Sequence, residues 1–163
     1  MLRVEAIHTY YGLSHILRGV SLSVGQGEVV CLLGRNGAGK STTMRSIMGL
    51  TPPKRGTIVF RESPLAGRKP FQVARLGIGF VPDDRVVFGD LTVEENLEIS
   101  ERHPDGRSQW DRQTVYELFP ALKPIATRKA GYLSGGERQM LTIARALVRS
   151  EERRVGKECR SRW

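Results

Sequence analysis

Two stretches near the start of the chain alternate apolar and polar residues. Residues Leu2 to Tyr10 follow this period of two as an edge strand would, and Gly19 to Val24 follow it again before a Gly25-Gln26-Gly27 turn. Because successive side chains of a strand point to opposite faces of a sheet, alternation is typical of a strand with one covered face. The pattern predicts two half-exposed antiparallel strands.

Continuous apolar runs follow further along the chain. Residues Val29 to Leu33 and Gly77 to Val81 contain no charged side chain, as expected of central strands that helices cover on both faces. A short strand is predicted from Thr57 to Phe60, and apolar spacing predicts a helix from Thr42 to Leu50. Strands and helices alternate, so the pattern predicts an α/β fold.

The pattern becomes helical from Leu91 onward. Thr92 stands three residues before Glu95, the spacing of a capping box at the start of a helix. A second amphipathic segment runs from Trp110 to Leu118 and is broken by proline at position 120. Together they predict a helical insertion. Its apolar side chains are expected to form a local core: Trp110, Val115, Leu118 and Phe119.

The octapeptide Gly34 to Ser41, Gly-Arg-Asn-Gly-Ala-Gly-Lys-Ser, directly follows the apolar run 29–33. It fits the pattern G-x-x-x-x-G-K-[ST], in which glycines let successive backbone N–H groups turn toward phosphate oxygens. The loop opens onto the predicted helix at Thr42, whose N-terminal partial positive charge also favours an anion. The sequence therefore predicts a nucleotide-binding protein.

Composition and charge narrow the class of protein, its location and its partners. With 163 residues, 39% hydrophobic and 26% charged, the chain is typical of one soluble domain. We expect a cytoplasmic location, because the sequence shows neither a membrane-spanning run nor a secretion signal. The net charge is +9, of which residues 149–163 supply six basic against three acidic side chains. The other charges are scattered, which favours a solvated surface over a nucleic-acid partner.

A second capped helix is predicted from Leu133 to Leu147. Ser134 stands at its start, and Gly135 and Gly136 let an anion approach the backbone closely. Residues 34–41 resemble a Walker A motif, and residues 133–139 resemble the signature motif of ATP-binding cassette ATPases. The chain is therefore identified as a member of that family.

The resemblance implies a P-loop NTPase core of ABC type with an N-terminal antiparallel β subdomain and a helical insertion. It implies that residues 1–148 are the N-terminal part of one ATPase domain, with a helical subdomain at about 91–133 and a signature helix at about 134–148. In that family two cassettes pack head to tail and clamp ATP between the Walker A loop of one and the signature helix of the other. The implied partner is thus a second ATPase subunit, identical or different.

The resemblance also implies roles in binding ATP and Mg²⁺. Lys40 would bridge β- and γ-phosphate oxygens, Ser41 would coordinate the metal, and Tyr11 would stack on adenine, with Tyr10 as the alternative. The implied ATP-binding set is Tyr11, Gly34, Asn36, Gly37, Ala38, Gly39, Lys40, Ser41 and Thr42, and the set facing the partner's ATP is Leu133, Ser134, Gly135, Gly136 and Glu137.

A narrower similarity lies in Gly77 to Leu97, which is similar to the ATPase subunits of LivF-type importers of branched-chain amino acids. This similarity implies transmembrane permease subunits as partners, a peripheral position on the cytoplasmic face of the membrane, and no nucleic acid. Most cassettes place Gln, and LivF-like members often Glu, where this chain has Asp83. Asp83 either reaches Mg²⁺ and the attacking water or only begins the loop, residues 83–90, that docks the permease.

The family pattern stops after Val148. An apolar strand ending in Asp-Glu and a later His should follow, to bind Mg²⁺ and polarise water. Residues 149–163 have no such strand and resemble the translation of a sequencing-library adapter. We expect a cut near Val148 and an artefactual tail, the alternative being a genuine basic tail.

Three functions remain open at this point. The intact protein is expected to hydrolyse ATP and energise import of branched-chain amino acids. The chain as written lacks the catalytic carboxylates, so it is expected to act as a non-catalytic nucleotide-binding fragment. A cassette ATPase for another substrate, or one associated with nucleic acid, is the remaining alternative.

Overall fold

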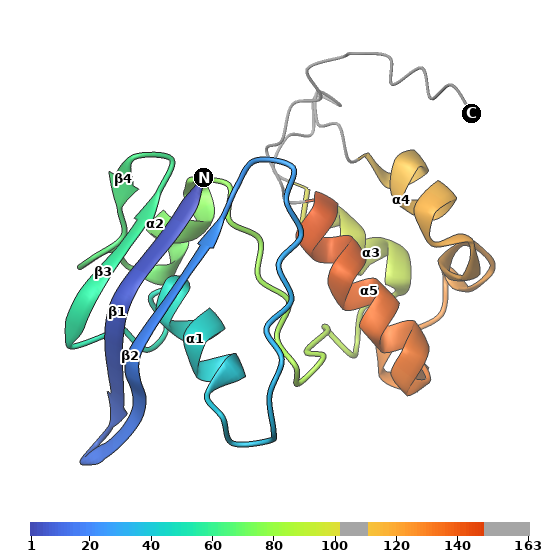
Figure 1. Cartoon of the computed structure of the whole chain (residues 1–163). Helices are drawn as coiled ribbons and strands as arrows, with labels where there is room; N and C mark the ends of the chain where they lie inside the picture. The colour runs from blue at the N-terminus through green and yellow to red at the C-terminus, as the bar shows by residue number, and fades with distance from the viewer. Residues whose placement is uncertain (102–110, 149–163) are drawn as a thin grey trace, which may run out of the picture. The chain divides into compact units, whose positions relative to one another are not determined.

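The computed structural model describes residues 1–101 and 111–148. The chain divides into two units, Met1–Phe80 and Val81–Trp163. In Figure 1 the first unit runs from blue to green and the described part of the second from light green to red. Across the described residues, no helix is both long and apolar enough to cross a membrane.

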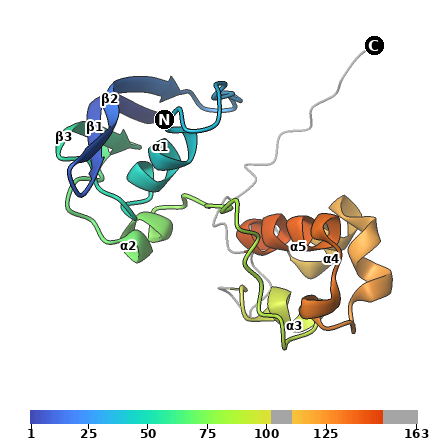
Figure 2. The same ribbon diagram turned by 90° about the horizontal axis from the view of Figure 1, so that it is seen from below.

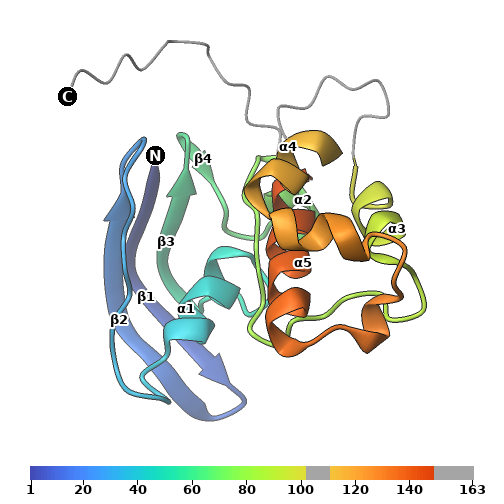
Figure 3. The same cartoon turned by 90° about the vertical axis from the view of Figure 1, so that its right-hand side faces the viewer.

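A four-stranded antiparallel sheet forms the frame of the first unit (Figure 3). Its strands are β1 (Leu2–Tyr11), β2 (Ser14–Val24), β3 (Arg55–Phe60) and β4 (Ser63–Pro64), in the order β2-β1-β3-β4. The strands predicted near the N-terminus and at 57–60 are confirmed, and so is the antiparallel pairing of the first two.

The expectation that the first strand lies at an edge of the sheet is wrong. Strand β1 pairs with β2 through Val4 and Leu22 and with β3 through Val4 and Ile58. Alternation of apolar and polar residues indicates that one face of a strand is covered. It does not indicate whether the strand has a neighbour on one or on both of its hydrogen-bonding edges. The partner β3 lies more than 40 positions away in the sequence, where local pattern cannot identify it.

Helix α1 (Lys40–Ile47) packs on β1 and β2, as Figure 3 shows, and confirms the predicted helix after the glycine-rich loop. Helix α2 (Pro70–Arg75) has no counterpart in the sequence predictions. It has six residues, too few to display a helical period. The core between sheet and helices consists of Val4, Ile7, Leu17, Ile47, Met48, Ile58, Phe60, Leu65 and Val73.

The two predicted central strands, 29–33 and 77–81, are not strands in the structure. Val29 is 96% exposed and Leu33 84% exposed, so the expected burial of the run 29–33 is also wrong. In the run 77–81, Ile78 and Phe80 are partly buried and pack against the core of the first unit. An apolar run becomes a strand only when a neighbouring strand bonds its N–H and C=O groups. No described segment pairs with either run, which is the physical reason for the difference.

The described part of the second unit is helical. Helices α3 (Val93–Glu98) and α4 (Arg112–Leu118) lie beside α5 (Gly135–Val148), as Figure 2 shows. Two 3₁₀ helices, η1 (Pro120–Ile125) and η2 (Ala130–Tyr132), connect α4 to α5. The core of this unit consists of Val93, Leu97, Val115, Leu122, Ala130, Leu133, Leu141, Ala144 and Val148.

The predicted local core is confirmed in part. Val115 is fully buried, and Phe119 packs against the core. Leu118 is 51% exposed, so its expected burial is wrong; it lies in the last turn of α4, where the chain turns into the Pro120 connection. Trp110 lies outside the described residues.

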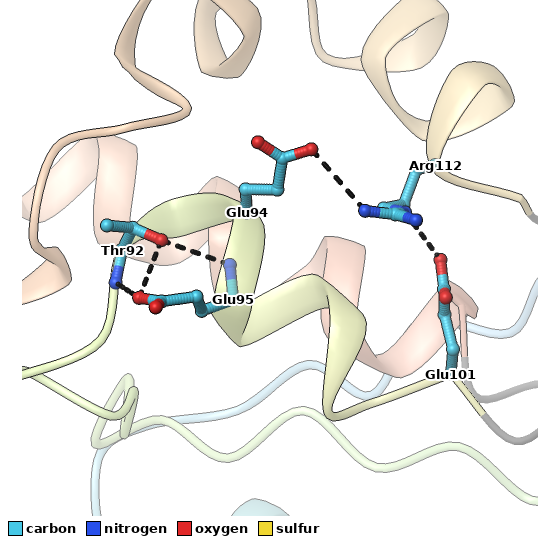
Figure 4. A network of polar contacts seen from close by, with 5 residues as sticks. All are labelled: Thr92, Glu94, Glu95, Glu101 and Arg112. Atoms are coloured by element: carbon cyan, nitrogen blue, oxygen red, sulfur yellow. Dashed lines mark hydrogen bonds and ion pairs between the residues drawn. The ribbon is translucent and has the colours of Figure 1, made fainter.

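The predicted capping box of α3 is confirmed (Figure 4). The Thr92 N–H donates to Glu95 Oε2 at 2.7 Å, and the Glu95 N–H donates to Thr92 Oγ1 at 3.1 Å. The Thr92 hydroxyl also donates to Glu95 Oε2, at 2.8 Å. The two bonds that Thr92 donates stabilise the carboxylate and lower the pKa of Glu95. In the same view Arg112 of α4 bridges Glu94 at 3.4 Å and Glu101 at 2.9 Å, which ties α4 to α3.

Candidate functional site

The glycine-rich loop of the first unit turns its backbone in a way that glycine permits. Gly37 and Gly39 have φ values of 85° and 92°, a region that side chains with a Cβ rarely adopt. Within the described residues, only the Ala38 N–H of the loop segment 35–40 donates to a backbone carbonyl, that of Arg35 at 3.2 Å. The other amides of this segment are therefore available to an anion.

Gly39 is also required by packing. A Cβ on Gly39 would lie 2.6 Å from Leu17 Cδ2, far inside van der Waals contact. The close approach lets α1 begin at Lys40, directly after the loop, with the Thr43 N–H bonded to the Gly39 carbonyl at 2.8 Å. The first turn of α1 contains no acidic residue and has no side-chain cap. No side chain at this helix start therefore neutralises the partial positive charge of the helix dipole.

The Lys40 side chain folds back over the loop. Its Nζ donates to the carbonyls of Gly34 at 2.7 Å and Arg35 at 2.9 Å. An ammonium group has three donors, so two hold the loop closed and one can bind a further acceptor. The arrangement places a positive charge in the same loop as the available amides.

The residues after Lys40 bear on metal binding. Ser41 is exposed at the first turn of α1, and Thr42 is buried. A hydroxyl oxygen is a ligand that Mg²⁺ accepts. No cluster of three His, Cys, Asp or Glu side chains that could hold a metal occurs among the described residues. The donor set fits an ion that takes most of its ligands from phosphate and water, as Mg²⁺ does.

Tyr11 lies on the face of the sheet that α1 covers. Its neighbour Thr9 is fully buried and bonds Ser46 of α1 at 2.9 Å between hydroxyl oxygens. The Tyr11 hydroxyl accepts from Thr51 at 3.4 Å, and this bond, with smaller contributions from Arg45 and Thr42, lowers the pKa of Tyr11. The ring is 44% exposed.

Tyr10 has different neighbours. Its ring stacks on His15 at 4.2 Å between centroids, and Lys54 Nζ lies 5.0 Å from its centroid. His15 Nε2 is also 3.1 Å from Nδ1 of His8. The Tyr10 ring is thus occupied by these side chains, while Tyr11 lies beside the helix that carries the loop.

The predicted second anion site is the start of α5. The Ser134 N–H donates to Glu137 Oε2 at 2.7 Å, and the Glu137 N–H donates to Ser134 Oγ at 3.3 Å. The bonds from Ser134 are the main cause that lowers the pKa of Glu137, with a smaller contribution from Arg128. Leu133 is 5% exposed and anchors this start in the core. The predicted capped helix is confirmed.

The two glycines at this helix start differ in their surroundings. A Cβ on Gly136 would meet no atom within 4 Å, whereas a Cβ on Gly135 would lie 3.0 Å from Arg85 Nη1. Arg85 has a φ of 52° and makes a long contact of 3.5 Å from Nη1 to the Gly135 carbonyl. Asp83, two residues earlier, is exposed.

The candidate residues thus fall into two groups, one in each unit. The first unit brings Tyr11 close to the helix that follows the loop 34–41, and the second brings Asp83 and Arg85 into the same unit as residues 133–137. Sequence reasoning missed the contact of Arg85 with Gly135, and it missed Thr51 beside Tyr11. No motif marks either residue, because each contact joins segments distant in the sequence.

Comparison with known proteins identifies the relatives of this chain. A family model described as ABC transporter matches residues 17–153. BraG of Pseudomonas aeruginosa, a high-affinity branched-chain amino acid transport ATP-binding protein, is 42% identical over 91% of this chain and 64% of its own length. LivF of Archaeoglobus fulgidus, a probable branched-chain amino acid transport ATP-binding protein, is 39% identical with the same two coverages.

A relative from an export system and a solved cassette structure are also similar to this chain. LptB of Acidithiobacillus ferridurans, a lipopolysaccharide export system ATP-binding protein, is 36% identical over 92% of this chain and 63% of its own length. A dimeric ATP-binding cassette in a post-hydrolysis state with ADP and Pi superposes with a TM-score of 0.78 at 26% identity, covering 91% of this chain and 70% of that one.

The chain spans less than two thirds of the length of the curated relatives it matches, 64% for BraG and LivF. The structural match confirms the predicted cassette fold. The matching family model covers most of the sequence and includes the loop 34–41 and the helix start 133–137. The chain therefore belongs to the ABC transporter family.

Proposed function

We propose that this chain is part of the ATP-binding and ATP-hydrolysing subunit of a transporter that imports branched-chain amino acids. The observation that carries the nucleotide part is the loop 35–40, where available amides and the Lys40 ammonium share one turn. The similarity to BraG and LivF, whose names state branched-chain amino acid transport, supports the substrate.

The loop holds the phosphates in this proposal. The amides of Asn36, Gly37, Gly39 and Lys40 bind phosphate oxygens, together with those of Ser41 and Thr42 at the first turn of α1. The third donor of Lys40 bridges the β- and γ-phosphates, while its other two donors keep the loop closed. Because the loop is already folded, little backbone ordering opposes binding.

Tyr11 stacks on the adenine ring. Its half-exposed ring and its hydroxyl bond to Thr51 favour it over Tyr10, whose ring already stacks on His15. When nucleotide is bound, the Ser41 hydroxyl would be one ligand of Mg²⁺, an ion that would supply positive charge beside the phosphates. We propose no step for Asp83 beyond its place at the start of the loop 83–90.

A second cassette subunit completes the site. Ser134, Gly135 and Gly136 face the γ-phosphate of ATP held by that subunit, and residues 1–148 are part of one ATPase domain. The solved cassette with ADP and Pi is dimeric, which supports this assembly. The loop 83–90 exposes Val86 and Phe88 and docks a permease subunit at the cytoplasmic face of the membrane.

The polypeptide of residues 1–163, taken by itself, binds nucleotide without turning it over. The sequence of residues 149–163 contains no apolar run that ends in two carboxylates, the groups expected to activate water. ATP-dependent protection of the chain without phosphate release supports this proposal, and appreciable phosphate release contradicts it.

Export of a different substrate is the second candidate. LptB, of a lipopolysaccharide export system, is only a little less similar than BraG and LivF. ATPase subunits of importers and exporters would use the same loop, so the loop does not separate the two. ATP-dependent uptake of leucine by the complete protein with its permease in vesicles supports import, and its absence beside active ATP hydrolysis favours the second candidate.

The loop assignment has a direct test with a matched control. Lys40→Ala in the 163-residue chain is expected to weaken binding of a fluorescent ATP analogue at least about tenfold, because it removes a charge-assisted bond to phosphate. Lys54→Ala removes a lysine of the same unit that lies over Tyr10 and is expected to bind as the unsubstituted chain does. Equal affinities for both variants contradict the assignment.

A further inference from the structure

The segment 85–92 precedes α3 in the second unit and is exposed along much of its length. Val86 is 60% exposed and Phe88 51% exposed, and Arg85 has the left-handed φ of 52°. Loops with these features are usually mobile. Here, however, side chains from α3 and α5 bond the backbone of the segment at several points.

Asn96 of α3 supplies the first set of bonds. Its side chain is fully buried, and its Oδ1 accepts from the Phe88 N–H at 3.0 Å. Its Nδ2 lies near three carbonyl oxygens, those of Phe88 at 2.9 Å, Thr92 at 2.9 Å and Leu91 at 3.3 Å. A buried amide needs such partners, so Asn96 and the loop backbone stabilise each other.

Arg145 of α5 supplies the second set. Its Nη1 donates to the Val86 carbonyl at 3.1 Å, and its Nε donates to Ser100 Oγ at 3.1 Å. The guanidinium carbon also lies 4.6 Å from the centroid of the Phe88 ring, within the range of a cation–π contact. Ser100 Oγ donates to the Asn96 carbonyl at 2.9 Å, which joins the two sets into one network.

Two further contacts reach η2 and the start of α5. The Gly131 N–H donates to the Gly89 carbonyl at 2.9 Å, and a Cβ on Gly131 would lie 3.1 Å from that oxygen. Arg85 reaches the Gly135 carbonyl. The segment is therefore bonded to α3, to the last turn of α5 through Arg145, to η2 through Gly131 and to the start of α5 through Gly135.

The geometry points to Asn96 and Arg145 as positioning residues that fix the segment 85–92 to the helix α5, so that this segment and the start of α5 move as one body. The inference rests on the proposed function, in which the segment docks a permease and the start of α5 faces ATP. Neither residue belongs to the loop 34–41, where nucleotide is proposed to bind. Their role is to hold the distance between the docking loop and Ser134 to Gly136.

Arginine suits this role better than lysine. A planar guanidinium can donate in two directions and lie flat on an aromatic ring, as Arg145 does with Val86, Ser100 and Phe88. Lysine retains the charge but has a single ammonium on a flexible stem. Arg145→Lys therefore separates positioning from charge.

Hydrogen exchange of the 163-residue chain tests the network. In Arg145→Lys the amides of Phe88 and Leu91 are expected to exchange about tenfold faster, because one charge-assisted bond to the segment is lost. The control Arg112→Lys, at the bridge between α4 and α3, is expected to leave both amides unchanged. Phe88→Leu, which removes only the ring contact, is expected to raise the exchange of Leu91 less. Unchanged exchange in both Arg145→Lys and Phe88→Leu overturns the inference.

A second measurement uses the complete protein with its permease. Arg145→Lys is expected to lower kcat for ATP about tenfold with KM unchanged, because the loop 34–41 is untouched. A raised KM with unchanged kcat overturns the positioning role, since Arg145 would then affect nucleotide binding alone. Failure of the proposed function is distinguishable from failure of the positioning role. In that case the unsubstituted protein would not hydrolyse ATP, while the faster amide exchange in Arg145→Lys would still be observed.

Discussion

The starts of α1 and α5 carry the two predicted anion sites, and they are built in opposite ways. Helix α1 follows a loop with no side-chain cap and no acidic residue in its first turn. Helix α5 is capped by its own residues, because Ser134 and Glu137 exchange two hydrogen bonds. A helix start without a side-chain cap keeps backbone N–H groups that can bind an external anion. A capped start has fewer such N–H groups, because its own side chains already accept from them.

The difference agrees with the proposed division of labour. The loop before α1 has several amides and an ammonium group for one ligand, so it can hold a nucleotide alone. The start of α5 retains the open backbone around Gly136, and in the proposed function it contributes only when a second subunit brings ATP to it. Four substitutions break or sharpen this comparison, and they follow from the largest expected effect to the smallest.

Gly39→Ala is expected to have the largest effect. The new Cβ meets Leu17 Cδ2 and the residue must keep a φ of 92°, which together should lower the free energy of unfolding by about 2 to 4 kcal/mol. Gly37→Ala has a similar φ of 85° but open space around the Cβ, and about 1 kcal/mol is expected. Urea unfolding measures both. Equal losses would show that the contact with Leu17 does not shape the loop.

Tyr11→Ala is expected to weaken binding of ATP about tenfold, the loss of one base-stacking contact. Tyr10→Ala is the matched control, because its ring already stacks on His15, and it should leave the affinity unchanged. Titration with a fluorescent ATP analogue gives both values. A larger loss in Tyr10→Ala would exchange the roles of the two residues.

Ser134→Ala is expected to lower the free energy of unfolding by about 1 kcal/mol, because the amide of Glu137 loses its side-chain acceptor. Thr92→Ala removes the same bond from the capping box of α3, so a similar loss should follow. Nucleotide binding by the single chain should persist in both variants. If Ser134→Ala abolishes binding by a single chain, the start of α5 is part of the primary site and the comparison fails.

Glu137→Gln is expected to have the smallest effect on stability, and this effect should change as the pH becomes acidic. The pKa of Glu137 is lowered in the folded state, so its contribution to stability is present above the unfolded pKa and is lost as pH falls through the folded pKa. Unfolding midpoints measured from neutral pH down to strongly acidic pH should fall less steeply in Glu137→Gln. Parallel curves would show that the carboxylate does not cap α5.

Local features were predicted well from the sequence. The capping box at Thr92, the helix capped at Ser134 and the helix after the glycine-rich loop all depend on residues a few positions apart, and all three are confirmed. The loop 34–41 could be recognised because the chemistry of phosphate binding restricts both residue types and spacing. The roles assigned to its residues stay predictions.

Features that depend on distant segments were predicted poorly. The run 29–33 has the composition of a buried strand, yet no described segment supplies its hydrogen-bonding partners. The contacts of Asn96 and Arg145 with the segment 85–92 join three elements, and no spacing along the chain reveals them. A sequence pattern indicates which secondary structure a segment can form, while its hydrogen-bonding partners in the fold decide which structure it adopts.

Amide hydrogen exchange of the 163-residue chain with and without MgATP tests the central claim most directly. The account predicts slower exchange of the amides from Asn36 to Thr42 when nucleotide is added, with Gly135 and Gly136 unaffected in a single chain. Protection confined to Gly135 and Gly136, or none in the loop at saturating nucleotide, would contradict it.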